Sequence, residues 1–339
     1  MPSLLRWKTL AGLLASVIAV SVLVGCTVPR PPGASPLRYR DQVFNSVNVT
    51  HDLQYGSAPD NNGNPVALKL DLYQPSGDTQ TKRPAVVWVH GGSFCCGDKT
   101  SPEIVDEANT FAKLGYVAVS INYRLLAPAG SCSGSTAGSS TCVTAALEAK
   151  HDAQAAVRWL RAKATTYRID PGRIGIGGSS AGAITATLVG LFSEDTGSSG
   201  NPGFPSTVGG FVSLSGGLPG GVFAGAGDAP GVLFHGTADP VVPYQWSADT
   251  AAAMLNSGVA AFLEPLDGAG HVPYAQFRDL ILSQSDYFFY SVLDLAHAQG
   301  QPPAAARAFD RKVAAAGVEH PRILRQATKH RAAQARIAR

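Results

Sequence analysis

The fold is decided by one stretch of sequence, Arg173-Ile174-Gly175-Ile176-Gly177-Gly178-Ser179-Ser180-Ala181-Gly182, which continues into Ala183 to Leu191. Its first part predicts a short buried strand, and the Ala- and Leu-rich continuation predicts a helix. A Gly-x-Ser-x-Gly turn centred on Ser180 joins them, and an overlapping frame on Ser179 lacks the second glycine. The turn is so tight that a Cβ atom at Gly178 or Gly182 would collide with neighbouring backbone. A strand, this turn and a helix together expose a serine at a helix N-terminus, so Ser180 is a candidate nucleophile.

The elements around this turn predict an α/β fold. Two strand-like runs, 44–55 and 67–73, flank a turn at 60–65 and predict an antiparallel hairpin. After Pro84, short apolar runs alternate with helical stretches. Strands are expected at 85–89, 116–121, 174–177, 210–214, 232–235 and 260–263, and helices at 102–114, 145–164, 183–191, 246–256 and 280–298. This series predicts a mostly parallel central sheet with antiparallel N-terminal strands and helices on both faces.

The N-terminal segment predicts export. Arg6 and Lys8 precede an apolar run, 10–24, that is too short to span a membrane comfortably. The run ends in Leu23-Val24-Gly25-Cys26, which resembles a bacterial lipobox. The resemblance implies a lipoprotein signal peptide at 1–25, with acyl groups such as palmitate attached at Cys26. We therefore expect an exported protein that a lipid anchor holds on the bacterial cell envelope membrane. A Pro-rich spacer, 26–40, is expected to lift the domain off that membrane.

Cysteines outside this segment suggest disulfides, because four remain in a chain predicted to leave the cytosol. Cys132 and Cys142 bracket nine residues of a Gly- and Ser-rich loop, and we predict that they pair. Adjacent Cys95 and Cys96 are left open: they bond to each other, to that loop or to nothing. Two Gly- and Ser-rich segments, 125–144 and 194–207, are expected either to form the rim of a pocket or to be idle surface loops.

Charge is unevenly distributed. The formal net charge of the 339 residues is +3, so the whole chain implies neither an acidic partner nor nucleic acid. Residues 301–339 hold nine Lys/Arg and two Asp/Glu, a local balance of +7. This Ala-rich tail lacks a continuing apolar face, so we expect it to be disordered or to contact anionic lipid headgroups. No metal-type His/Cys spacing appears, and no metal or organic cofactor is expected.

Backbone N–H groups able to hold an oxyanion are predicted beside Ser180. The loop His90-Gly91-Gly92-Ser93-Phe94 directly follows the strand 85–89. Its small residues let the backbone approach a negatively charged tetrahedral oxygen, which N–H donors stabilise. We assign the oxyanion hole to the N–H groups of Gly92, Ser93 and Ala181, the last following Ser180. The histidine of this loop precedes the serine and is interpreted as an orienting residue.

An acid and a base are predicted in two later loops. Asp239 ends His235-Gly236-Thr237-Ala238-Asp239, which begins in a buried strand, and His271 ends a Gly-rich loop after the last strand. The carboxyl ends of parallel strands meet at one edge of a sheet, so these loops should converge. The order Ser180, Asp239, His271 is typical of hydrolases with a serine nucleophile, a histidine base and an orienting carboxylate.

These motifs resemble α/β-hydrolases of the esterase/lipase group from about Pro84 to Pro273. The 90–94 loop is similar to the oxyanion motif of hormone-sensitive-lipase-like and related carboxylesterases. Residues 169–174 leading into the Ser180 turn, the acid loop 235–239 and the histidine loop 268–271 are also typical of that group. Ser93 stands where a third glycine is common, and Ser179 where an acidic residue often precedes the nucleophile. The resemblance implies an α/β-hydrolase domain over 41–300.

We therefore predict a serine carboxylesterase that hydrolyses small-molecule esters through an acyl-enzyme. A serine peptidase or amidase using the same three residues is a second hypothesis, because one fold supports both reactions. A comparison of matched ester and amide substrates would separate these two. A non-catalytic, lipid-anchored binding module is a third hypothesis, and failure of a fluorophosphonate probe to label the folded protein would favour it.

Overall fold

A computed structural model of the protein describes residues 27–136, 138–219, 224–225 and 227–298. The signal peptide at 1–25, the lipidation site Cys26 and the tail 301–339 lie outside the described residues. No helix among those described is long and apolar enough to cross a membrane.

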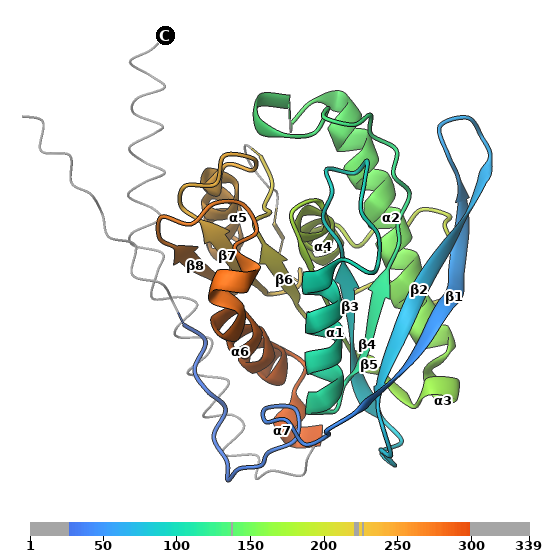
Figure 1. Ribbon diagram of the computed structural model, residues 1–339, viewed down its shortest axis with the longest axis vertical. Coiled ribbons are helices and arrows are strands. Elements are labelled where there is room, and N and C mark those ends of the chain that lie inside the picture. Colours follow the sequence, from blue (N-terminus) through green and yellow to red (C-terminus); the bar gives the residue numbers. More distant parts are fainter. Residues whose placement is uncertain (1–26, 137, 220–223, 226, 299–339) are drawn as a thin grey trace, which may run out of the picture.

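The described residues form one eight-stranded sheet with helices on both faces (Figure 1). Its strand order is β1-β2-β4-β3-β5-β6-β7-β8. Strand β2 pairs antiparallel with both β1 and β4, whereas all the pairs from β4 to β8 are parallel. The strands are β1 (Val47–Pro59), β2 (Pro65–Pro75), β3 (Arg83–Val89), β4 (Val117–Ile121), β5 (Ile169–Ser179), β6 (Phe211–Leu214), β7 (Gly231–Gly236) and β8 (Ala261–Leu266). The predicted fold class, including the N-terminal hairpin, is confirmed.

Two hydrophobic cores, one on each face, hold the sheet in place. In β3, Val87 packs in the core that contains α2, α4 and α5, whereas Trp88 packs in the core that contains α1 and α6. This division follows from the alternation of side chains along a strand, and burial on both faces explains the continuous apolar run. The helices are α1 (Pro102–Leu114), α2 (Ser140–Ala162), α3 (Ala164–Tyr167), α4 (Ala181–Leu191), α5 (Tyr244–Asn256), α6 (Tyr274–Val292) and α7 (Leu295–Ala298).

Two helices differ from the sequence prediction. Helix α2 begins at Ser140, inside the segment expected to be a loop, because Cys142 in its first turn is buried against the core. The closing helix expected at 280–298 is instead α6 and α7, since the backbone turns left-handed at Asp294 with φ of 54°. A short 3-10 helix, Gly134–Thr136, was also not predicted.

The predicted spacer is wrong for its described part, 27–40, because this segment lies against the domain. Val28 is buried and its N–H donates to Gln284 of α6. Tyr39 is also buried and packs edge-on against Tyr116. Burial of these two apolar side chains stabilises the contact, so the packed domain begins before residue 41.

Candidate active site

Ser180 lies in a strained turn between β5 and α4. Its φ and ψ are 51° and −117°, a region that few non-glycine residues occupy and that surrounding structure must enforce. A Cβ atom at Gly178 would lie 2.5 Å from the Val89 carbonyl oxygen, and one at Gly182 would overlap the same oxygen. The predicted collisions are therefore present, and they explain why glycine flanks the serine on both sides. The turn presents the Ser180 hydroxyl at the N-terminus of α4.

The three predicted catalytic side chains lie in one hydrogen-bonded chain. Nε2 of His271 is 2.8 Å from the Ser180 hydroxyl, and Nδ1 is 2.8 Å from Oδ2 of Asp239. A carboxylate only accepts hydrogen bonds, so Nδ1 carries the proton and Nε2 is left to accept the hydroxyl proton of Ser180. Ser180, Asp239 and His271 follow β5, β7 and β8, at the carboxyl edge of the parallel strands.

The carboxylate of Asp239 is buried and fully hydrogen-bonded. Oδ1 accepts from the backbone N–H groups of Val241 and Val242, at 2.8 and 3.0 Å. Oδ2 lies 2.8 Å from Nδ1 of His271 and 3.2 Å from Nε2 of His235. Burial alone raises the pKa of Asp239, but the hydrogen bonds from both histidines and both amides outweigh it and hold the pKa well below its usual range. The residue is therefore an anion at neutral pH.

The three predicted oxyanion donors belong to residues near Ser180 in the fold or the chain. Gly92 and Ser93 line the same cleft as Ser180 and His271, and Ala181 is the first residue of α4. Within the described part of the chain, the N–H groups of Gly92, Ser93 and Ala181 donate to no acceptor. Gly92 and Ser93 both have positive φ, 117° and 53°, so Ser93 adopts the conformation that a third glycine would otherwise supply. These N–H groups are free to bind an oxyanion.

His90 packs against Tyr123 within the predicted oxyanion loop, and its Nδ1 lies 2.6 Å from the Gly91 carbonyl oxygen. Its buried ring stacks on Tyr123 with 4.4 Å between centroids. The Tyr123 hydroxyl donates to the His90 carbonyl at 3.2 Å. Burial lowers the pKa of His90, so the ring is neutral. The orienting role of His90 stays a prediction.

The acidic residue that often precedes the nucleophile is absent from this sequence, but a carboxyl group from another part of the chain approaches the same position. Ser179, which stands where an acidic residue is common, donates its hydroxyl to Oε1 of Glu103 at 2.8 Å. Glu103 is in the first turn of α1 and lines the cleft with Ser180 and His271. The cleft therefore has a carboxyl group beside the predicted nucleophile, contributed by another element of the fold. No local motif signals this contact.

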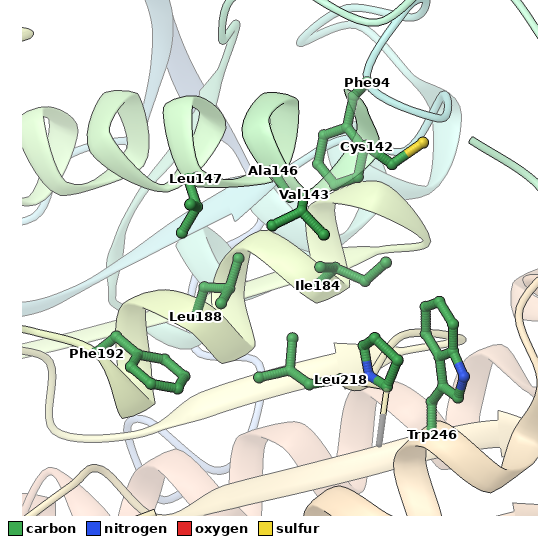
Figure 2. Close-up of a pocket in the computed structure, with 11 residues that line it drawn as sticks. Phe94, Cys142, Val143, Ala146, Leu147, Ile184, Leu188, Phe192, Leu218 and Trp246 are labelled. Carbon is green, nitrogen blue, oxygen red and sulfur yellow. The ribbon is translucent and has the colours of Figure 1, made fainter. Parts of the chain in front are cut away.

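The site has two cavities, a cleft that contains the predicted catalytic residues and a pocket lined by hydrophobic side chains. The cleft, about 370 Å³, contains the serine, the histidine and Glu103. The pocket, about 220 Å³, lies between α2 and α4 and is shown in Figure 2. Its lining is hydrophobic and comes from Phe94, Cys142, Val143, Ala146, Leu147, Ile184, Leu188, Phe192, Leu218, Pro219 and Trp246. Each part of the site can thus bind a chemically different part of a substrate.

The loops predicted as candidate pocket rims behave differently. Cys142 and Val143, from the end of segment 125–144, line the apolar pocket. Segment 194–207 lines neither the cleft nor this pocket, because Ser199 and Asn201 bond to the backbone of β1. Of the two predicted rim segments, 125–144 therefore contributes to the pocket and 194–207 does not.

Both pairs of cysteines are joined. Cys132 and Cys142 form a disulfide with Cα atoms 5.5 Å apart, as predicted. Cys95 pairs with its neighbour Cys96, which resolves the alternatives that the sequence left open. The N–H groups of both Cys95 and Cys96 donate to the Gly92 carbonyl, so these hydrogen bonds hold the turn that carries two predicted oxyanion donors. No group of three or more His, Cys, Asp or Glu side chains able to hold a metal occurs in the described part of the chain.

Two residues that position the site were not assigned by sequence reasoning. His235 donates to the Asp239 carboxylate, and Ser215 accepts from the N–H of Val272, next to His271. His235 lies four residues before Asp239 in a motif that the sequence displays, so its position could have been noticed. Ser215 follows β6 and gives no comparable signal.

The strand order and the arrangement of loops at the sheet edge are those of the α/β-hydrolase fold. The BD-FAE family matches residues 70–207. Phenmedipham hydrolase of Pseudarthrobacter oxydans is 34% identical over 119 residues, which cover 35% of this chain and 22% of that protein. Matches to curated relatives cover between 19% and 32% of those proteins' lengths.

Solved structures support the same fold. A thermophilic esterase from the Planctomycetes species Thermogutta terrifontis, with propionate bound, has a TM-score of 0.58 and 24% identity, covering 76% of this chain and 97% of that chain. A truncated carbohydrate esterase from gut microbiota has a TM-score of 0.57 and 22% identity, covering 75% and 98%. The chain has the α/β-hydrolase fold, and the predicted resemblance to the esterase/lipase group is confirmed.

Proposed function

We propose that this protein is a serine carboxylesterase that works through an acyl-enzyme. The observation that carries the proposal is the hydrogen-bonded chain from Ser180 through His271 to Asp239, next to three backbone N–H groups without acceptors. The esterases, lipases and hydrolases among its sequence relatives support the same activity. A serine, a base and an oxyanion site are the parts that acyl transfer requires.

In the first half-reaction, Ser180 Oγ attacks the ester carbonyl carbon and its proton passes to Nε2 of His271. Asp239 stabilises the resulting imidazolium, and the N–H groups of Gly92, Ser93 and Ala181 bind the oxyanion. His271 then gives the proton to the leaving alcohol as the C–O bond breaks. In the second half-reaction, water attacks the acyl-enzyme in the same way, releasing the acid and restoring the Ser180 hydroxyl.

The residues that line the two cavities support an arrangement of the two sides of the ester. The leaving oxygen must lie within reach of His271, and His271 lines the cleft but not the apolar pocket. The alcohol therefore occupies the cleft. The acyl group extends past Phe94, which directly follows the oxyanion donor Ser93, and past Ile184, which lies one helical turn after Ser180. The apolar pocket thus favours an apolar acyl group.

Filling this pocket tests the assignment. Leu147 lines the pocket and is 38% exposed, so Leu147→Trp adds bulk without disturbing the buried core. The variant should retain activity on p-nitrophenyl acetate and lose at least tenfold in kcat/KM on p-nitrophenyl octanoate. Leu125→Trp is the matched control, because Leu125 is 41% exposed and lines neither cavity. An unchanged preference for acyl chain length would contradict the assignment.

The Ser180→Ala variant tests whether Ser180 is the nucleophile in ester hydrolysis. The purified variant should lose hydrolysis of p-nitrophenyl acetate and labelling by a fluorophosphonate probe, while Ser179→Ala should keep both. Parallel assays with the matched p-nitroanilide should show slower turnover than the ester. Full ester turnover by the Ser180→Ala protein would refute the proposed mechanism, and faster turnover of the anilide would favour a peptidase or amidase.

We also propose that the mature protein is exported and anchored to the cell envelope membrane through lipid on Cys26. The positive residues, the apolar run and the lipobox-like end of segment 1–26 support this proposal. The ester substrate would then be met outside the cytosol, and the membrane would be the partner of the anchor.

A further inference from the structure

His235 is a buried histidine next to the active site, and the esterase mechanism does not use it. It is the penultimate residue of β7, and no part of its side chain is exposed. Nδ1 is 2.7 Å from the Ser247 hydroxyl oxygen, and Nε2 is 2.9 Å from the Val242 carbonyl oxygen. Nε2 is also 3.2 Å from Oδ2 of Asp239. Both ring nitrogens therefore have close polar partners.

The number of protons that these contacts require indicates the protonation state of the His235 ring. The Ser247 hydroxyl is also 2.8 Å from the Gly216 carbonyl oxygen, so the chain ends in a carbonyl on each side. Carbonyl oxygens only accept hydrogen bonds. The contacts Gly216–Ser247, Ser247–His235 and His235–Val242 thus need three protons, and the Ser247 hydroxyl supplies one. A neutral imidazole supplies one more, which leaves two lone pairs facing each other across one contact.

We propose that His235 is a buried imidazolium that holds the Asp239 carboxylate in position for His271. With both ring protons present, Nδ1–H donates to Ser247, Ser247 donates to Gly216, and Nε2–H is shared between Val242 and Asp239. Every polar atom in the chain is then satisfied, as buried polar groups require. The inference adds a positioning residue to the proposed esterase and rests on that function only for its catalytic consequence.

Among the residues that the structure describes, the carboxylate paired with His235 is Asp239. The Tyr244 ring, on α5, meets the His235 ring edge-on at 5.8 Å, and burial raises the pKa of Tyr244 to about 12, so its hydroxyl is neutral. Glu264 lies on the neighbouring strand β8, and burial raises its pKa as well. His271 shares the same carboxylate. A buried ion pair is stable only when hydrogen bonds satisfy its remaining atoms, and here both partners have them.

The charge of His235 has a consequence for catalysis. Two positive rings on one carboxylate oppose each other, so the first cation makes it harder for His271 to hold a second proton. His271 must be unprotonated to accept the proton of Ser180. The proposed cation therefore keeps the base in its active form at lower pH, while its hydrogen bond keeps Asp239 aligned.

Nitrogen NMR on the intact protein tests the proposal directly. The chain has eight histidines, and ¹⁵N-labelled rings distinguish an imidazolium, with a proton on both nitrogens, from either neutral tautomer. The signal of His235 is identified by its loss in His235→Gln. We expect both of its ring nitrogens to carry protons at pH 7.5. A single bare nitrogen on His235 would overturn the proposal whether or not the protein hydrolyses esters.

A pH profile tests the positioning role. Gln at position 235 can still donate toward Val242 and Asp239 but carries no charge. We expect His235→Gln to lower kcat more than it raises KM, and to move the acid limb of kcat/KM upward by about one pH unit. His151→Gln is the matched control, because His151 pairs with Asp195 and lines neither the cleft nor the apolar pocket. A uniform loss of activity with an unmoved acid limb would show a structural role and refute the catalytic consequence. If His235→Gln does not fold, the NMR signal is assigned from Ser247→Ala instead.

Discussion

Replacing Asp239 with Asn is the sharpest test of how the site is built, because it keeps the size of the side chain. In the native protein, Oδ1 accepts two backbone amides and Oδ2 faces two imidazole nitrogens. An amide group has one oxygen and one NH2. Whichever way the Asn side chain is placed, its NH2 points at two N–H donors, and two hydrogen bonds are lost.

The expected orientation of the Asn side chain determines how large the loss in kcat is. The amides of Val241 and Val242 are fixed in the loop, so the oxygen should stay with them and the NH2 should face His271. His271 then has to present a bare Nδ1 and carry its proton on Nε2, which is the nitrogen that must accept from Ser180. This is the wrong tautomer for a base, and a triad in that state loses about 10⁴-fold in kcat. That loss equals about 5 kcal/mol of transition-state stabilisation.

The assay is kcat and KM for p-nitrophenyl acetate with the purified Asp239→Asn protein. KM should change little, because neither the cleft nor the apolar pocket is altered. Asp267→Asn is the control, since Asp267 sits in the neighbouring loop, is exposed and accepts from Thr237. A loss below tenfold in a variant with native circular dichroism would refute the assignment of Asp239 as the residue that orients the base.

Three further predictions concern the turn, a buried acid and the anchor. Gly182→Ala should lower the free energy of unfolding in urea by at least about 2 kcal/mol, because the added methyl overlaps the Val89 carbonyl; an unchanged urea midpoint would contradict the steric reasoning. Burial, with Glu103 and Asp106 nearby, raises the pKa of Glu107 well above its usual value, so the native state keeps a proton that the unfolded chain releases above about pH 4. Wild-type stability should therefore fall relative to Glu107→Gln as pH rises, by about 1.4 kcal/mol per pH unit until the native carboxyl ionises; an equal difference in urea unfolding at pH 4 and pH 8 would argue against this. Cys26→Ser should move the protein from the membrane fraction to the soluble exported fraction, and continued membrane association would count against lipid anchoring.

Sequence patterns predicted the sheet and the loops that carry the candidate catalytic residues, because both depend on local sequence. Buried parallel strands leave continuous apolar runs, and the loops that follow them carry the polar residues. The turn at Ser180 was predicted for a steric reason, and the same collisions are found in the structure. The alignment of Ser180, Asp239 and His271 follows once the strand order is known, since their strands end at one edge.

Features that depend on contacts between distant elements were not predictable in this way. Nothing near Ser179 indicates that Glu103 of α1 approaches it, because the contact exists only when α1 packs on the sheet. The start of α2 at Ser140 was missed for a related reason. Gly- and Ser-rich sequence favours a loop, but burial of Cys142 overrides that local preference. The described part of segment 27–40 was predicted as a spacer from its prolines, and packing of Val28 and Tyr39 outweighs them.

The Asp239 carboxylate is held by contacts from its own loop and by one contact from a distant loop. Of the four donors on Asp239, three come from residues 235, 241 and 242, within four residues of the acid itself. The remaining donor is His271, from the next strand. The carboxylate is therefore held in place by its own loop before the base arrives, and docking of the β8 loop has to position only His271. Preorganisation of this kind lowers the reorganisation that the reaction requires, because the anion does not move when the proton is transferred. It also explains why a short motif, read from His235 to Asp239, contains most of the information needed to build the acid side of the site.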